Sequence, residues 1–192
     1  MIMKRFCKRS FIGTLALAIL TSALPAFAAK EKTEDQLIAD LDSPKANLVT
    51  EAMLKLEKNY PTSTKAFPKI KSMLTDPRQP VRRKAARVLG ALHAELSGAD
   101  IKAISAMLKA ADGQEVMDAL KALRGLKAPQ AVPDILPLLK SPVPNVIRDA
   151  CRTLAILGTK DVIPSLEPLL NHSEPAVQKD AQDAIFKLKN RP

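Results

Sequence analysis

A segment of 31 to 34 residues recurs five times along this chain of 192 residues. When the copies are aligned on their apolar pattern, one position holds alanine in every copy, at Ala52, Ala85, Ala119, Ala150 and Ala181. Self-similarity at a nearly fixed period is typical of architectures in which each unit packs on its neighbours. The repeat therefore predicts an array of stacked units.

Each copy contains two segments with helical spacing, separated by short stretches rich in Pro, Asp, Ser and Gly that predict tight turns. Pro133 and Pro164 fit the first turn of a helix, whereas Pro137 and Pro168 lie further inside and are expected to kink it. The sequence thus predicts an all-α protein, a right-handed α-solenoid of about five helix pairs. The predicted copies are 33–61, 62–97, 98–127, 128–158 and 159–189.

The second copy resembles the HEAT-repeat family, in the short form first described in phycobilisome lyases. The family motif, D-x-x-x-x-V-R-x-x-A-A-x-A-L-G, is matched at Asp76, Val81, Arg82, Ala85, Ala86, Leu89 and Gly90. Later copies depart from it, with Ile147 and Gln178 in place of Arg82. The resemblance implies a HEAT-like solenoid, and such arrays serve as scaffolds, adaptors and occasional enzymes.

Residues 1–28 contain the three parts of a secretory signal peptide. Four basic residues come first, an apolar run over 11–20 follows, and Ala26 and Ala28 fit an A-x-A cleavage site. This predicts cleavage before Ala29, a periplasmic or secreted protein, and no transmembrane segment after signal removal. The alternative is an uncleaved membrane anchor over 11–29, which Pro25 disfavours.

Removal of the signal lowers the net charge from +10 to +6, because 26 Lys and Arg then face 20 Asp and Glu. The aromatic residues left are Tyr60, Phe67 and Phe186. This modest charge and this scarcity of aromatic residues argue against nucleic acid as a partner. Cys151 is then the one remaining cysteine, so no intrachain disulfide is expected. We expect it to be a small buried residue, half covered by an adjacent helix, with a reactive thiol as the alternative.

No catalytic grouping, Gly-rich phosphate loop or Cys-x-x-Cys pair is visible in the sequence. His93 and His172 lie in different copies, at a helix end and in a turn, and neither has a second ligand at metal spacing. Solvated or capping roles are expected for both. The sequence therefore predicts no enzyme, no metal and no cofactor, with a lyase of the phycobilisome type as the weaker alternative.

A row of basic residues follows the second segments of the copies. At 100° per residue, Arg83 and Arg87 lie away from the apolar side of their helix, and later copies repeat cations at these positions. The predicted partner-binding residues are Arg83, Arg87, Lys121, Arg124, Arg148, Arg152 and Lys179.

Second helices line the concave surface of such solenoids, so the row predicts a basic concave face for an acidic segment or surface of an unidentified protein. An anionic envelope lipid or polymer, or a merely solvated face, remain the alternatives, and the oligomeric state stays open. Asp118, Asp149 and Asp180 flank the row, in position to pair with it. We expect Arg87→Glu with Arg152→Glu to weaken binding without loss of stability.

Overall fold

The computed structural model describes residues 31–191, and every regular element in this range is helical. The prediction of an all-α solenoid is confirmed, whereas the predicted signal peptide lies outside the described residues. The α-helices are α1 (Glu34–Asp40), α2 (Ala46–Asn59), α3 (Ala66–Ser72), α4 (Gln79–Ala91), α5 (Gly98–Ala106), α6 (Gly113–Gly125), α7 (Val132–Ile135), α8 (Pro144–Leu157), α9 (Ile163–Leu166) and α10 (Pro175–Lys189).

The first helix of four pairs tightens into a 3-10 turn before it ends. These turns are η1 (Met73–Thr75), η2 (Met107–Lys109), η4 (Leu136–Lys140) and η6 (Glu167–Asn171). Pro137 and Pro168, which are expected to kink these helices, are the second residues of η4 and η6, where each helix changes from an α-helix to a 3-10 turn. Because η1 and η2 contain no proline, the tightening also occurs without one. Two further 3-10 turns, η3 (Pro129–Ala131) and η5 (Lys160–Val162), precede α7 and α9.

The second helices have identifiable start and stop signals. Proline occupies the first turn of α4, α8 and α10, where its missing N–H costs little. At the start of α6, the Asp112 carboxylate accepts a hydrogen bond of 2.8 Å from the Gln114 N–H. His93 and Lys127, with φ of 49° and 51°, take the left-handed conformation just after α4 and α6, which ends both helices.

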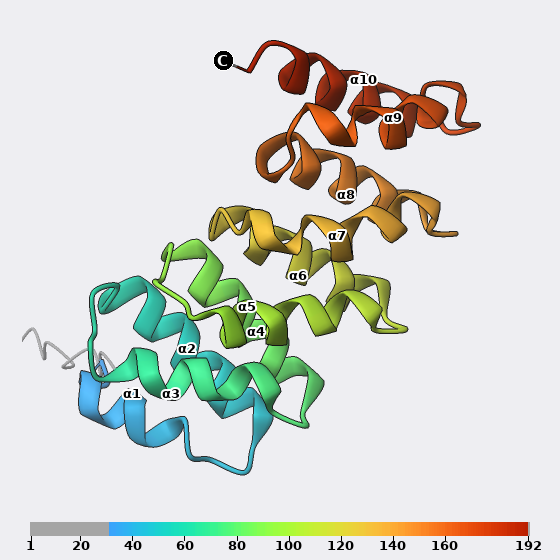
Figure 1. Ribbon diagram of the computed structural model, residues 1–192. Coiled ribbons are helices and arrows are strands. Elements are labelled where there is room, and N and C mark those ends of the chain that lie inside the picture. Colours follow the sequence, from blue (N-terminus) through green and yellow to red (C-terminus); the bar gives the residue numbers. More distant parts are fainter. Residues whose placement is uncertain (1–30, 192) are drawn as a thin grey trace, which may run out of the picture. The chain divides into compact units, whose positions relative to one another are not determined.

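Helices α2, α4, α6, α8 and α10 contact one another in chain order, as Figure 1 shows along its colour gradient. The five aligned alanines, one in each of these helices, are at most 1% exposed. Helices α4 and α6 approach each other closely: a Cβ added at Gly90 would lie 2.6 Å from the Ala122 Cα. A side chain at position 90 would therefore force the two helices apart.

Arginines link neighbouring second helices at two further places. Arg82 of α4 pairs with Glu115 of α6, whose side chain is almost wholly buried, and Gln79 donates to the same carboxylate. After α10, the Arg191 guanidinium donates to the carbonyls of Gly158 at 2.5 Å and Ala155 at 2.6 Å, at the end of α8. The arginine of the HEAT-like motif is thus half-buried and links its helix to the next copy through Glu115.

Candidate binding surface

Two of the predicted binding residues serve contacts between helices. The Arg83 Nη2 lies 2.8 Å from the Asp118 Oδ2 and links α4 to α6, while the Arg148 Nε lies 2.8 Å from the Asp180 Oδ2 and links α8 to α10. Both carboxylates are buried, Asp118 at 3% and Asp180 at 9% exposure. Removing Arg83 would leave the buried Asp118 without its ion pair, and removing Arg148 would leave Asp180 with Arg152 alone, so these cations stabilise the fold.

Arg152 takes part in the same network. Its Nε donates to the Asp180 Oδ1 at 3.1 Å, and its Nη1 lies 3.6 Å from the Asp149 Oδ1. Arg152→Glu would place a third carboxylate beside these two acids, which repel it. We therefore revise the expectation that Arg87→Glu with Arg152→Glu spares stability, since only the Arg87 change avoids the ion-pair network.

The other predicted cations of α4 and α6 surround one depression, which we call the cationic hollow. Arg87, Lys121 and Arg124 line it together with Lys84, which the predicted set left out. Its volume is about 360 Å³, and it lies beside the Gly90–Gly125 contact of the two helices. None of these four cations is ion-paired within residues 31–191. The hollow thus gathers the unpaired cations that the predicted row places on α4 and α6.

The charge in the cationic hollow is unbalanced. Glu57 of α2 is the one carboxylate that lines it, against four cations. Burial, and then the nearby Arg87, lower the pKa of Lys84 below its ordinary value. The carbonyl ends of α4 and α6 lie at the hollow and partly offset the positive charge. An anionic group entering the hollow would relieve the remaining repulsion.

A second hollow of about 320 Å³ adjoins the first along α8 and α10. Arg124 and Ile156 line both, so the two hollows share a wall, and we call them together the groove. The second hollow holds charges of both signs; its further charged residues are Arg152, Asp180, Asp183 and Lys187. The groove is therefore strongly basic at its α4–α6 end and mixed in charge at its α10 end.

Lys179 lies apart from the groove. It is exposed on α10, lines neither hollow and forms no ion pair within the described part of the chain. Sequence reasoning also missed two residues of the groove, Lys84 and Ile156. The repeat alignment carried a signal for Ile156, because other copies place Ala91, Gly125 and Lys187 at its position.

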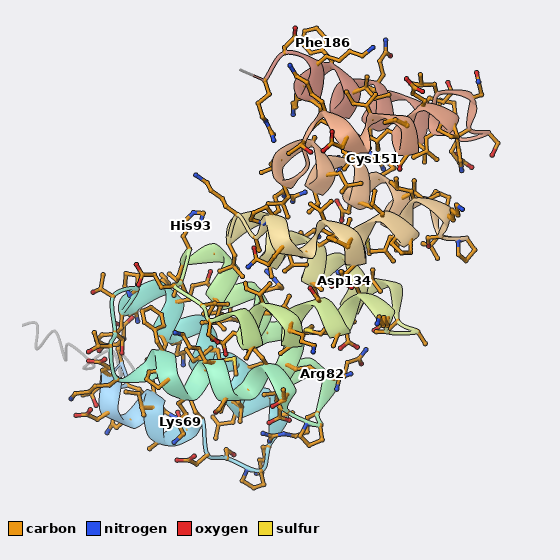
Figure 2. All side chains as sticks on the ribbon, viewed as in Figure 1. Lys69, Arg82, His93, Asp134, Cys151 and Phe186 are labelled. Atoms are coloured by element: carbon orange, nitrogen blue, oxygen red, sulfur yellow. The ribbon has the colours of Figure 1, made fainter. Side chains whose placement is uncertain are left out.

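Both histidines bond to nearby backbone, which agrees with the expected capping roles. The His93 Nδ1 donates to the Gly125 carbonyl at 2.6 Å at the edge of the cationic hollow, where Figure 2 labels it. The His172 Nδ1 accepts from the Glu174 N–H at 3.0 Å. Among residues 31–191, no three His, Cys, Asp or Glu side chains are grouped so as to hold a metal ion.

Cys151 lies in α8, where Figure 2 labels it, and it lines neither hollow. Its side chain is fully buried, so the prediction of a buried residue is confirmed and the cover is more complete than expected. Burial raises the pKa of the thiol to about 12. The thiol is therefore protonated and inaccessible in the folded protein, which removes it from the candidate site.

None of the helices in residues 31–191 has the length and the apolar character that a membrane span requires.

Comparisons with known proteins agree on the architecture. Residues 101–185 match the family model of HEAT repeats. A search of curated proteins finds no match. A solved structure of the CpcE–CpcF complex of phycocyanin lyase from Nostoc sp. PCC7120 is similar, with a TM-score of 0.72 and 25% identity over 88% of this chain and 70% of that one.

Designed repeat proteins have the same fold. A designed armadillo repeat protein in complex with the peptide (KR)4 gives a TM-score of 0.61 and 19% identity, over 79% of this chain and 80% of that one. An engineered protein gives a TM-score of 0.63 and 19% identity, over 82% and 80% of the two chains. At this identity the likeness concerns the helical-repeat fold alone.

Proposed function

We propose that the chain is a HEAT-repeat protein, and that it is an exported, non-catalytic interaction module that binds an acidic segment of a partner protein. The observation that carries the proposal is the cationic hollow, in which Lys84, Arg87, Lys121 and Arg124 face a single carboxylate. Unpaired cations at a depression between helices attract carboxylates and orient them on binding. The paired arginines of the predicted row keep the helices in register and leave this charge available.

A structural neighbour supports a peptide as the ligand. The designed armadillo repeat protein is described in complex with (KR)4, a peptide of alternating Lys and Arg. A designed protein with this helical-repeat fold thus binds a charged peptide. In this chain the groove itself is basic at one end, so the complementary segment is acidic.

An anionic envelope lipid or polymer is the alternative ligand. Attraction to such a surface depends on charge alone and is screened within about 10 Å at roughly 0.1 M salt. We favour a protein segment because the unpaired cations gather in a hollow rather than on one projecting surface. Binding of anionic vesicles that Arg87→Glu with Lys121→Glu leaves unchanged would place the lipid site elsewhere.

The similarity to a phycocyanin lyase complex favours a lyase as a second candidate. No catalytic grouping was found in the sequence, so the non-catalytic role remains our proposal. Absorption spectroscopy of the purified protein with added bilin pigment tests the difference. A stoichiometric spectral change would favour the lyase, whereas an unchanged spectrum agrees with an interaction module.

Export is a separate part of the proposal and rests on the sequence of residues 1–28. Mass spectrometry of the protein recovered from the periplasm or medium should find an N-terminus at Ala29. A protein that starts at Met1 and stays with the membrane fraction would favour the uncleaved anchor.

Affinity capture from the exported fraction tests the binding function. The baits are the wild type, a hollow variant with Arg87→Glu and Lys121→Glu, and a control with Lys160→Glu and Lys179→Glu. Both variants change the net charge equally, but the control residues line neither hollow. We expect a partner that the wild type and the control retain and the hollow variant loses. Equal loss from both variants would indicate unspecific charge attraction.

A further inference from the structure

On the premise of the proposed function, we infer that the partner segment carries an apolar side chain directly beside its carboxylates, and that Ile156 receives it. The structure thus points to a composite motif, with acidic residues at one end and an apolar residue next to them. This motif is more specific than a run of acidic residues.

The exposure of Ile156 is anomalous for its helix. The other large apolar side chains of α8, Val146, Ile147, Leu154 and Leu157, are buried, whereas Ile156 is 45% exposed. The equivalent positions of other copies hold Ala91, Gly125 and Lys187. The fold therefore does not require a large apolar side chain at this repeat position. Packing within the chain does not explain why residue 156 is an isoleucine.

The place of Ile156 links it to the charged site. It lines the cationic hollow and also the second hollow, so it stands on the wall between them. Four other large apolar residues of the described chain are exposed, and none lines either hollow; they are Leu54, Val143, Leu170 and Phe186. An extended chain advances roughly 3.3–3.6 Å per residue, so a residue close in sequence to a bound carboxylate reaches Ile156.

The charge pattern of the groove limits how far the acidic part extends. Beyond Ile156, the second hollow contains Asp180 and Asp183 beside Arg152 and Lys187, and Arg152 already pairs with Asp180. Carboxylates placed there would meet two acidic residues as well as cations, whereas those in the cationic hollow meet four unpaired cations and one carboxylate. The favoured segment therefore has its acids on one side of the apolar residue and not on the other.

Binding of short labelled peptides, followed by fluorescence anisotropy, tests the inference. The probes are Asp-Asp-Glu-Leu-Gly and Asp-Asp-Glu-Ser-Gly, together with both sequences in reverse order, because the structure leaves the direction of the chain open. We expect the leucine peptide of one order to bind the wild type about tenfold more tightly than its serine counterpart. Ile156→Ser should erase this difference and leave binding of the serine peptide unchanged.

The outcomes separate the inference from the proposed function. If leucine and serine peptides bind the wild type equally, and Arg87→Glu with Lys121→Glu weakens both, the apolar contact is refuted while the acidic-segment function stands. If Ile156→Ser weakens both peptides alike, the side chain supports the hollow and the inference is overturned. If no peptide binds the wild type at low salt, the proposed function fails as well. Circular dichroism of Ile156→Ser should match the wild type, because the side chain is exposed.

Discussion

Neighbouring cations on α4 have different surroundings, and this difference decides what each can do. Arg83 pairs with the buried Asp118, whereas Lys84 lies one residue further on, in the cationic hollow. The helical period places Arg83 and Lys84 on the solvent-facing side of α4. The sequence alone does not say which of these cations forms an ion pair with a carboxylate of the next helix. That depends on how α4 and α6 approach, and the approach is set by Gly90 and Ala122.

Gly90→Ala tests this approach at the residue scale. The added Cβ would lie 2.6 Å from the Ala122 Cα, so α4 and α6 must separate. We expect a loss of about 1–3 kcal/mol in the free energy of unfolding, measured by urea denaturation. Gly98→Ala is the control, because a Cβ there meets nothing within 4 Å. Equal effects of the two changes would contradict a tight helix contact at Gly90.

Cys151 gives a prediction about pH. Burial raises the pKa of its thiol from 9.0 to about 12, so the folded state holds this proton more tightly than the unfolded chain does. Its contribution to stability is complete below the unfolded pKa and is lost as the pH rises towards the folded pKa. Relative to Cys151→Ala, the wild type should lose about 1 kcal/mol between pH values of about 8 and 10. A constant difference in unfolding free energy between the two proteins would contradict the burial of the thiol.

At the scale of elements, the contacts between second helices differ from copy to copy. An arginine–aspartate pair links α4 to α6 and α8 to α10, but Met117 of α6 stands at the repeat position of Arg83 and Arg148. At the α6–α8 contact, the buried Asp149 has an ion pair only with Arg152 of its own helix, within the part of the chain described. Among the described residues, the α4–α6 and α8–α10 contacts therefore have an arginine–aspartate pair that the α6–α8 contact lacks.

Met117→Arg should supply an arginine–aspartate pair at the α6–α8 contact. An arginine here would reach Asp149 as Arg83 reaches Asp118, and we expect a gain of about 0.5–1 kcal/mol in unfolding free energy. Urea denaturation measures the gain, and the same change in an Asp149→Asn background is the control. A gain of equal size in that background would show that the arginine acts without the carboxylate.

At the scale of the whole molecule, the sequence predicted the architecture more fully than the site. The aligned alanines and the period of 31 to 34 residues suffice for a solenoid of helix pairs, because each aligned alanine is buried in its second helix. The row of cations followed from the same alignment. Some cations of the row are paired and others are not, and this depends on the distances between helices. The repeat period of the sequence does not predict those distances. Ile156 was visible as a departure from its equivalents, but its place between two hollows required the structure.

The location of peptide binding tests the central claim most directly. In a nuclear magnetic resonance titration with Asp-Asp-Glu-Leu-Gly and its reverse, the amide shifts should concentrate at the C-terminal ends of α4 and α6 and around Ile156. Arg87→Glu with Lys121→Glu should abolish these shifts without altering the rest of the spectrum. Shifts centred on Arg83 and Arg148, or spread evenly over exposed lysines, would contradict the cationic hollow as the binding site.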